Sequence, residues 1–101
     1  MNWQDYFAQF IPIPGIGIST VTKLAHFYGL TFGGFPALIL DMQIIGKIQR
    51  WSEVQMSGLR YDNAPQQYVA YLQNMHAAAF QIGCSEAQLE LFLFTFGSTM
   101  E

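Results

Sequence analysis

The sequence predicts an all-α protein, a single domain over residues 1–101 that forms a small bundle of about five helices. Apolar residues recur at helical spacing along most of the chain, and no alternation of apolar and polar residues indicates a strand. Glycine and proline residues divide these periodic stretches into segments of helix length. Hydrophobic residues make up 51% of the chain, so in a domain this small we expect some apolar side chains on the surface, where exposed patches indicate a partner.

The first predicted helix covers residues 3–10, and Asn2 is placed to cap it. Its apolar face consists of Trp3, Tyr6, Phe7 and Phe10. The stretch "IPIPGIG" at residues 11–17 then ends this helix, because proline cannot continue it. Gly15 and Gly17 are expected to supply positive φ angles in the turn.

The second helix is predicted to begin near Ser19 or Thr20, either of which can cap it, and to end at Gly29. We interpret "TFGGFPA" at residues 31–37 as a loop. The third helix is expected to follow Asp41, a natural N-cap. Its apolar face consists of Ile44, Ile45, Ile48 and Trp51.

Residues 52–64 are mostly polar and irregular, with a short helical turn expected at residues 53–56. The fourth helix is the longest: Asn63 is predicted to cap it, Pro65 lies in its first turn and Gly83 ends it. Its apolar side is predicted to contain Tyr68, Tyr71, Leu72, Met75 and Phe80.

The final helix is predicted over residues 86–96, "EAQLELFLFTF", and Gly97 is expected to close it. Ser85 and Gln88 have the spacing of a capping box at its start. Residues 91–94 are apolar on nearly every side of the helix, so we expect them at the centre of the protein or at an interface.

The charge composition limits the partners of the protein. Its net charge at pH 7 is −3, and its cationic residues are Lys23, Lys47, Arg50 and Arg60. A broad electrostatic contact with nucleic acid needs several cations near the phosphates. This composition therefore allows only a small local site for nucleic acid.

Metal sites, cofactors and disulfides are not predicted. Cys84 is the single cysteine, and His26 and His76 are isolated in the sequence, so each histidine is expected to be structural. No apolar run approaches the length of a membrane span, and the N-terminus lacks the features of a secretory signal. We therefore expect no membrane association and a cytoplasmic location.

The turn at residues 13–18 has the form h-P-G-h-G, where h is hydrophobic, and this form describes a helix-hairpin-helix. Glycines let the backbone approach a phosphate closely, and N–H groups at the start of the next helix attract its negative charge. Such contacts hold the DNA backbone without reading the bases. The same pattern also occurs in plain turns between helices, so the turn alone leaves both interpretations open.

The segments that follow this turn add to the pattern. After "ISTVTKLAHFYG" come a Gly/Phe/Pro loop and "ALILD" at the head of a helix. This order resembles the helix-hairpin-helix DNA glycosylase superfamily, in which an essential aspartate follows the hairpin and its loop. The segments "ALILDMQIIGKI" and "YVAYLQNMHAAAFQIGCSEAQLELFLFTFG" are similar to the bacterial 8-oxoguanine-glycosylase-like branch. The resemblance runs over about residues 11–97.

This resemblance implies roles for particular residues. Pro14, Gly15, Gly17 and Ser19 would contact the DNA backbone, and Asp41 would be the catalytic carboxylate. A carboxylate beside the sugar carbon can stabilise the positive charge that develops as the bond to the base breaks, or it can activate the nucleophile. An aspartate in this position is also a common N-cap, and one side chain can have both roles.

Superfamily members that also cut the DNA strand carry a catalytic lysine five residues after the hairpin proline. That position is Ser19 in this sequence. Lys23 lies one helical turn further on the same face, so it is the candidate for a similar catalytic role. The alternative for Lys23 is a solvated cation on the helix surface.

The resemblance covers the C-terminal half of such an enzyme. Complete members have several helices before the hairpin, and these helices form much of the pocket that holds a flipped base. Here one short helix precedes the hairpin. Three interpretations remain open: a truncated or split enzyme whose missing wall comes from a second chain, a catalytically inactive dimeric interaction module, and a mobile-element fragment with no DNA role. Any DNA binding is expected to be weak and non-specific.

The same comparison predicts a homodimer. In a complete enzyme these helices pack against an N-terminal half, so their apolar faces would need another cover. The residues expected at that interface are Trp3, Phe7, Phe10, Trp51 and residues 92–96. A two-fold pair is the commonest way to cover such a surface with one gene product.

Overall fold

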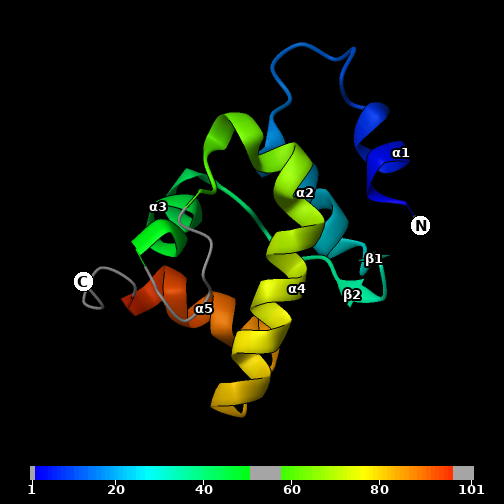
Figure 1. The fold of residues 1–101 in the computed structure, drawn as a ribbon. Helices are drawn as coiled ribbons and strands as arrows, with labels where there is room; N and C mark the ends of the chain where they lie inside the picture. Colours follow the sequence, from blue (N-terminus) through cyan, green and yellow to red (C-terminus); the bar gives the residue numbers. More distant parts are fainter. Residues whose placement is uncertain (1, 51–57, 97–101) are drawn as a thin grey trace.

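The computed structural model describes residues 2–50 and 58–96, which form five α-helices, a 3₁₀ turn and one short β-hairpin (Figure 1). In chain order the elements are α1 (Trp3–Ala8), α2 (Ile18–Phe27), β1 (Thr31–Phe32), β2 (Phe35–Pro36), α3 (Met42–Arg50), the 3₁₀ turn (Tyr61–Asn63), α4 (Ala64–Ile82) and α5 (Glu86–Phe96). The long helix α4 runs through the middle of the molecule, and α5 packs against both α3 and α4. The predicted five helices are confirmed in the described residues, but the all-α prediction is corrected, because a small antiparallel sheet is also present.

Helix α1 packs into the core through its aromatic face. The Asn2 side chain caps this helix by accepting hydrogen bonds from the backbone N–H groups of Gln4 and Asp5, as predicted. Trp3 is only 3% exposed, and its indole Nε1–H donates to the carbonyl oxygen of Pro65 in α4 at 2.7 Å. The Tyr6 hydroxyl donates to the carbonyl oxygen of Val21 in α2 at 3.0 Å. Helix α1 is thus bonded to both α2 and α4.

These contacts correct part of the predicted dimer interface. Trp3 is buried within its own chain, and Phe7 and Phe10 are partly buried against the same core. The chain covers the apolar face of α1 itself, because Trp3 packs against α4 and β1 and Tyr6 is bonded to α2. Trp51 lies outside the described residues.

The N-cap of helix α2 lies two residues before Ser19, the earlier of the two predicted caps. Gly17 occupies its N-cap position, so Ser19 and Thr20 lie inside the first turn rather than at the cap. Gly15 has the expected positive φ of 83°, but the φ of Gly17 is −107°, so the expectation of a positive φ there is wrong. An N-cap residue takes extended backbone angles, which explains why Gly17 does not adopt the left-handed region. The helix ends at Phe27 with Tyr28 as its C-cap, and Gly29, the residue predicted to stop it, follows with a positive φ of 66°.

The predicted loop at residues 31–37 contains an antiparallel pair of strands instead. Phe32 pairs with Phe35, and Thr31 pairs with Pro36, around a two-residue turn. Gly33 and Gly34 both have positive φ, of 61° and 85°, which is the requirement of a type I′ hairpin turn. Two-residue strands are too short to show alternation in a sequence, so the purely helical prediction missed this sheet.

Helix α3 confirms the predicted cap at its start. The Oδ1 atom of Asp41 accepts a hydrogen bond from the backbone N–H of Ile44 at 2.9 Å. Ile44, Ile45 and Ile48 are buried, as their spacing predicted. The expected helical turn at residues 53–56 and the expected closing residue Gly97 lie outside the described residues.

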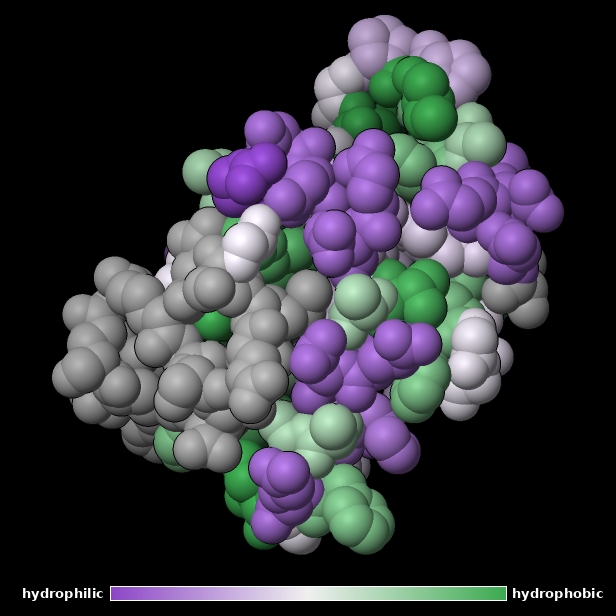
Figure 2. Space-filling view, in the orientation of Figure 1, coloured by the Kyte–Doolittle hydropathy of each residue, from purple (hydrophilic) through white to green (hydrophobic). Residues whose placement is uncertain are grey.

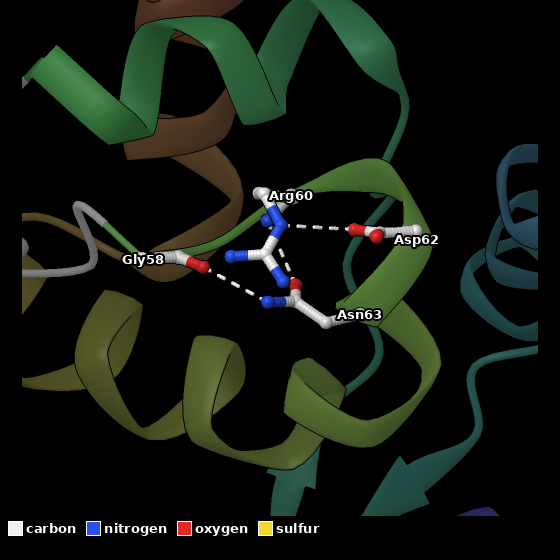
Figure 3. A network of polar contacts seen from close by, with 4 residues as sticks. All are labelled: Gly58, Arg60, Asp62 and Asn63. Carbon is white, nitrogen blue, oxygen red and sulfur yellow. Dashed lines mark hydrogen bonds and ion pairs between the residues drawn. The ribbon is translucent and has the colours of Figure 1, made fainter.

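Helix α4 begins and ends where predicted, but Asn63 does not cap it with its side chain. Figure 3 shows the Asn63 side chain turned back onto the preceding turn. Its Nδ2 donates to the carbonyl oxygen of Gly58 at 2.9 Å, and its Oδ1 accepts from the backbone N–H of Arg60 at 2.7 Å. Pro65 in the first turn has no N–H that needs a cap. At the other end, Gly83 adopts the left-handed conformation with φ 88°.

One residue predicted for the buried side of α4 is exposed. Tyr68, Tyr71, Leu72 and Met75 are buried as expected, but Phe80 is 81% exposed. Ala78 and Ala79 complete the buried face in the last turns, and Phe80 lies about 100° further around the helix than Ala79.

Helix α5 begins with the predicted capping box. The Ser85 hydroxyl accepts from the backbone N–H of Gln88 at 3.1 Å, and the Gln88 side chain accepts from the backbone N–H of Ser85 at 2.9 Å. Leu93 is buried, whereas Leu91 is 66% exposed, so only one side of the apolar run is central. In the parts of the chain that the structure covers, no helix combines the length and the apolar character that crossing a membrane requires.

Candidate functional site

The segment at residues 37–41 connects β2 to α3 and lies along one side of α2. The carbonyl oxygen of Ala37 is 3.0 Å from His26 Nδ1, near the end of α2. The backbone N–H of Leu40 donates to the Thr22 hydroxyl at 2.9 Å, one turn closer to the start of the helix. The segment therefore runs antiparallel to α2, and its last residue lies toward the first turn of that helix.

Asp41 is this last residue, and it is half-buried. Thr22, which binds the neighbouring Leu40, donates its hydroxyl proton to the carbonyl oxygens of Ile18 and Ser19 at 2.9 and 3.1 Å. A short chain of hydrogen bonds thus connects the residue before Asp41 with the first turn of α2. One carboxylate oxygen of Asp41 caps α3, and the other forms no hydrogen bond with any residue of 2–50 or 58–96.

The segment is also held by α4. The Tyr68 hydroxyl donates to the carbonyl oxygen of Leu38 at 2.6 Å and accepts from the backbone N–H of the same residue at 3.0 Å. Burial raises the pKa of the Tyr68 phenol above its usual value of 10, so the group stays protonated and can donate. One tyrosine therefore satisfies both backbone groups of Leu38.

Helix α5 contributes a buried carboxyl group to the same segment. Glu90 is 4% exposed, and its Oε1 accepts from the backbone N–H of Ile39 at 3.1 Å. The Tyr71 hydroxyl lies 2.9 Å from Glu90 Oε2 and 3.4 Å from the carbonyl oxygen of Ile39. Burial raises the pKa of Glu90 to about 7, although the hydrogen bonds from Tyr71 and Ile39 act in the opposite direction.

This raised pKa predicts a stability that depends on pH. The folded protein holds the Glu90 proton more tightly than the unfolded chain, whose carboxyl has the usual pKa of 4.5. The stabilisation from this group is therefore complete below pH 4.5 and is lost as the pH rises to about 7. A rise of about 2.5 in pKa corresponds to about 3 kcal/mol in the free energy of unfolding.

Urea unfolding at pH 5 and pH 8 measures this effect. Glu90→Gln keeps an uncharged group that can accept and donate hydrogen bonds, so its stability should lack this pH dependence. An equal loss of stability between pH 5 and pH 8 in both proteins would show that Glu90 is not the group responsible.

The start of α2 differs from the starts of the other helices. Side chains cap α1, α3 and α5, and α4 has a proline in its first turn. Among the described residues, no side chain accepts a hydrogen bond from the first-turn N–H groups of α2. Gly15 stands before this end with open space where a Cβ atom would lie. Pro14 and Gly15 are exposed, and Gly17 and Ser19 are half-buried.

Exposed apolar side chains precede the uncapped start of α2 in the chain. Ile11 is 68% exposed and Ile13 is 48% exposed in the connection between α1 and α2. Figure 2 shows hydrophobic side chains, in dark green, near the top of the view, next to pale purple residues. Pro14 and Gly15, two of the residues predicted to contact DNA, thus lie on a connection that is exposed and partly apolar.

The cationic side chains differ in their exposure and in the partners that they already bind. Lys23 is exposed on α2 and forms no hydrogen bond or ion pair with another residue in the described part of the chain. Lys47 donates to the carbonyl oxygen of Leu93 at 2.8 Å, and Arg60 pairs with Asp62 at 3.1 Å (Figure 3). The side chain of Arg50 is not among those that the structure describes. Lys23 is therefore the described cation best placed to meet a phosphate at the start of α2.

The two histidines and the cysteine do not form a metal site among the described residues. His26 binds the Ala37 carbonyl, and His76 Nδ1 lies 2.6 Å from Glu86 Oε1 on the surface. Cys84 is a half-buried free thiol. Across residues 2–50 and 58–96, no three His, Cys, Asp or Glu side chains are grouped so that they could hold a metal ion.

Two side chains of this site were missed by the sequence analysis. Among the residues whose burial the structure describes, Thr22 and Glu90 are the buried polar ones, and each binds the segment before Asp41. In the sequence, Glu90 stands out as a charged residue inside the run "QLELFLF", because large apolar side chains flank it on both sides. The sequence offered no comparable signal for Thr22.

Comparisons with known proteins identify the family. Residues 3–94 match the family described as "Putative 8-oxoguanine DNA glycosylase OGG-like protein". No curated protein and no solved structure matches the chain. Because the family match spans nearly all of the sequence, the chain belongs to the 8-oxoguanine DNA glycosylase OGG-like family.

Proposed function

We propose that the protein binds duplex DNA through its phosphate backbone, and that the contact lies at the turn before α2 and the first turn of that helix. The observation that carries this proposal is the uncapped start of α2 behind an exposed Pro14-Gly15 turn. Membership of a DNA glycosylase family supports it. The turn would then act as the helix-hairpin-helix that its sequence describes.

The first-turn N–H groups of α2 are the donors that would bind the phosphate. An uncapped helix start presents such groups together with the positive end of the helix dipole, and a phosphate satisfies both. Gly15 removes a side chain from the approach to this end. Lys23, one turn further along, adds a positive charge on the same helix.

The expected binding is weak and independent of base sequence. Each phosphate that a cation neutralises adds about 0.9 to the slope of log affinity against log salt on duplex DNA. With Lys23 as the main cation at the site, the slope should be shallow. Phosphate contacts alone carry no sequence information.

Thr20→Glu tests this proposal. Thr20 is exposed in the first turn of α2, and a carboxylate there would repel a phosphate. We expect affinity for a labelled duplex to fall by at least about tenfold, because like charges a few Å apart near a protein surface repel by more than about 1 kcal/mol. An acidic residue in a first helical turn favours the helix, so the thermal unfolding temperature should not fall.

Ala87→Glu is the matched control. It places the same charge in the first turn of α5, which begins at the opposite end of the molecule from the start of α2 (Figure 1). Fluorescence anisotropy should show unchanged affinity for this variant. An equal effect of both substitutions, or an effect of neither, contradicts the proposed contact.

We further propose that Asp41 is the catalytic carboxylate for removal of a damaged base, with 8-oxoguanine as the substrate base because the family description names it. Two features support this role: Asp41 is half-buried, and only one of its oxygens is used in the helix cap. Lys23 is the second candidate in the reaction, as the amine that would assist strand cleavage.

We also propose that the protein assembles as a homodimer. The second candidate function is an inactive dimeric interaction module. An apolar groove of about 350 Å³ at the corner between α4 and α5 favours both proposals, because a second copy could cover it. Ile82, Leu89 and Phe92 line this groove. Sedimentation at micromolar concentration distinguishes the assemblies, because a homodimer has twice the 11.4 kDa mass of one chain.

A further inference from the structure

Ile39 is held by side chains that are distant from it in the sequence. Its N–H donates to Glu90 on α5, 51 residues away, and its carbonyl oxygen lies within reach of the Tyr71 hydroxyl on α4. Tyr71 and Glu90 are also bonded to one another at 2.9 Å. The three residues form a closed set of contacts two positions before Asp41.

We propose that Glu90 and Tyr71 form a clamp on Ile39 that positions the Asp41 carboxylate, with Glu90 as a positioning residue and not a catalytic one. This inference rests on the catalytic role proposed for Asp41. Leu40 alone separates Ile39 from Asp41, the cap of α3, and Leu40 is itself bonded to Thr22. A displacement of Ile39 would therefore be transmitted to Asp41 through one buried residue.

The hydroxyl of Tyr71 has one proton for two acceptors, and a charged acceptor takes it in preference to a neutral one. Both Glu90 Oε2 and the Ile39 carbonyl oxygen are within hydrogen-bonding reach of the hydroxyl. When Glu90 is ionised, the phenol donates to the carboxylate. When Glu90 is protonated on Oε2, the acid can donate to the phenol oxygen, and the phenol proton is free to bind the Ile39 carbonyl.

The clamp is thus complete in the protonated state of Glu90. In that state both backbone groups of Ile39 are bound, its N–H by Glu90 and its carbonyl by Tyr71. In the ionised state the Ile39 carbonyl loses its partner to the carboxylate. Protonation of one buried acid therefore changes how tightly the segment before Asp41 is held.

The surroundings of Glu90 place this change near neutral pH. Burial, with the nearby Asp41 charge, favours the neutral acid, whereas Tyr71, the Ile39 N–H and His26 on α2 favour the charged form. Tyr68 on α4 lies close enough to Glu90 for its own pKa to be raised by the carboxylate charge. On α3, Lys47 donates to the carbonyl oxygen of Leu93, one turn beyond Glu90 on α5.

The test follows the amide signals of Ile39, Leu40 and Ile44 by ¹⁵N–¹H NMR, since Ile44 reports the Asp41 cap. In the unaltered protein the Ile39 signal should titrate with a midpoint near pH 7, as Glu90 does. Tyr71→Phe removes only the hydroxyl, and we expect the Ile39 and Ile44 amides to exchange with solvent about tenfold faster, the effect of one buried hydrogen bond. Tyr28→Phe, on an exposed ring, is the matched control.

Glu90→Gln separates positioning from general stability. It preserves an acceptor for the Ile39 N–H and a donor for Tyr71, so the three amides should stay protected while the pH titration of Ile39 disappears. An Ile39 signal that still titrates in Glu90→Gln, or an Ile44 amide that exchanges equally in Tyr71→Phe and Tyr28→Phe, overturns the clamp.

Base excision gives a second readout of the same proposal. Tyr71→Phe should lower the rate of excision at saturating duplex and leave the affinity for DNA unchanged, and the pH profile should lose its inflection near pH 7 in Glu90→Gln. If the unaltered protein excises no base, the proposed catalytic role fails. The amide measurements need no activity, so they still decide whether the clamp controls the Asp41 cap.

Discussion

Asp41→Asn is expected to reduce excision of 8-oxoguanine from duplex DNA by at least about 100-fold, the usual contribution of a positioned acid or base. Asparagine caps a helix as well as aspartate does, so the Ile44 contact and the stability of α3 should be preserved. The substitution removes the charge that would stabilise the developing positive charge on the sugar or activate the nucleophile. The measurement is an abasic-site assay on a duplex that contains the damaged base.

Asp5→Asn is the matched control for this experiment. Asp5 also lies in the first turn of a helix, but it is exposed on α1, away from the segment at residues 37–41. Its substitution should leave excision unchanged. If Asp41→Asn retains activity, Asp41 is a helix cap alone, and if the unaltered protein is inactive, the chain is better described as a binding module.

Trp3→Ala is expected to lower the free energy of unfolding by about 4 kcal/mol, in the range measured for large aromatic residues in cores. Trp3 packs against Phe7, Phe32 and Tyr68, with ring centroids 5.3, 5.4 and 4.1 Å away. The substitution also leaves the Pro65 carbonyl without its indole partner. A loss of this size is a large fraction of the stability of a small domain.

Urea unfolding followed by circular dichroism measures this loss. Trp3→Phe retains an aromatic ring and loses the indole hydrogen bond, so it should cost only about 1 to 2 kcal/mol and stay folded. Gln4→Ala, at the exposed neighbouring position, should change stability by less than about 0.5 kcal/mol. An unchanged midpoint for Trp3→Ala would show that α1 is not part of the core in solution.

The features that the sequence predicted well depend on interactions within a few residues. The caps by Asn2 and Asp41 and the capping box of Ser85 with Gln88 each join groups three residues apart or fewer. Short spacing leaves a recognisable pattern of residue types, and so does a glycine such as Gly83 in the left-handed conformation. These local signals were sufficient to locate the ends of most helices.

The features that the sequence did not predict depend on distant partners or on very short elements. Glu90 is held by Ile39 and Tyr71, which are 51 and 19 residues away, and no local pattern records those contacts. The Gly33-Gly34 turn was present in the sequence, but its two-residue strands gave no alternation that would have revealed a hairpin. Trp3 was assigned to an interface because the sequence does not show that α1 packs onto its own chain.

An NMR titration locates the proposed DNA contact at the start of α2 residue by residue. The ¹⁵N-labelled protein is titrated with a short duplex that contains 8-oxoguanine, and the backbone amide signals are followed at two salt concentrations. We expect the signals of residues 15–20 and Lys23 to shift most, and the shifts to decrease only modestly as the salt concentration rises. Shifts confined to the α4–α5 corner, or no shifts at residues 15–20 at a saturating duplex concentration, would contradict the proposed contact.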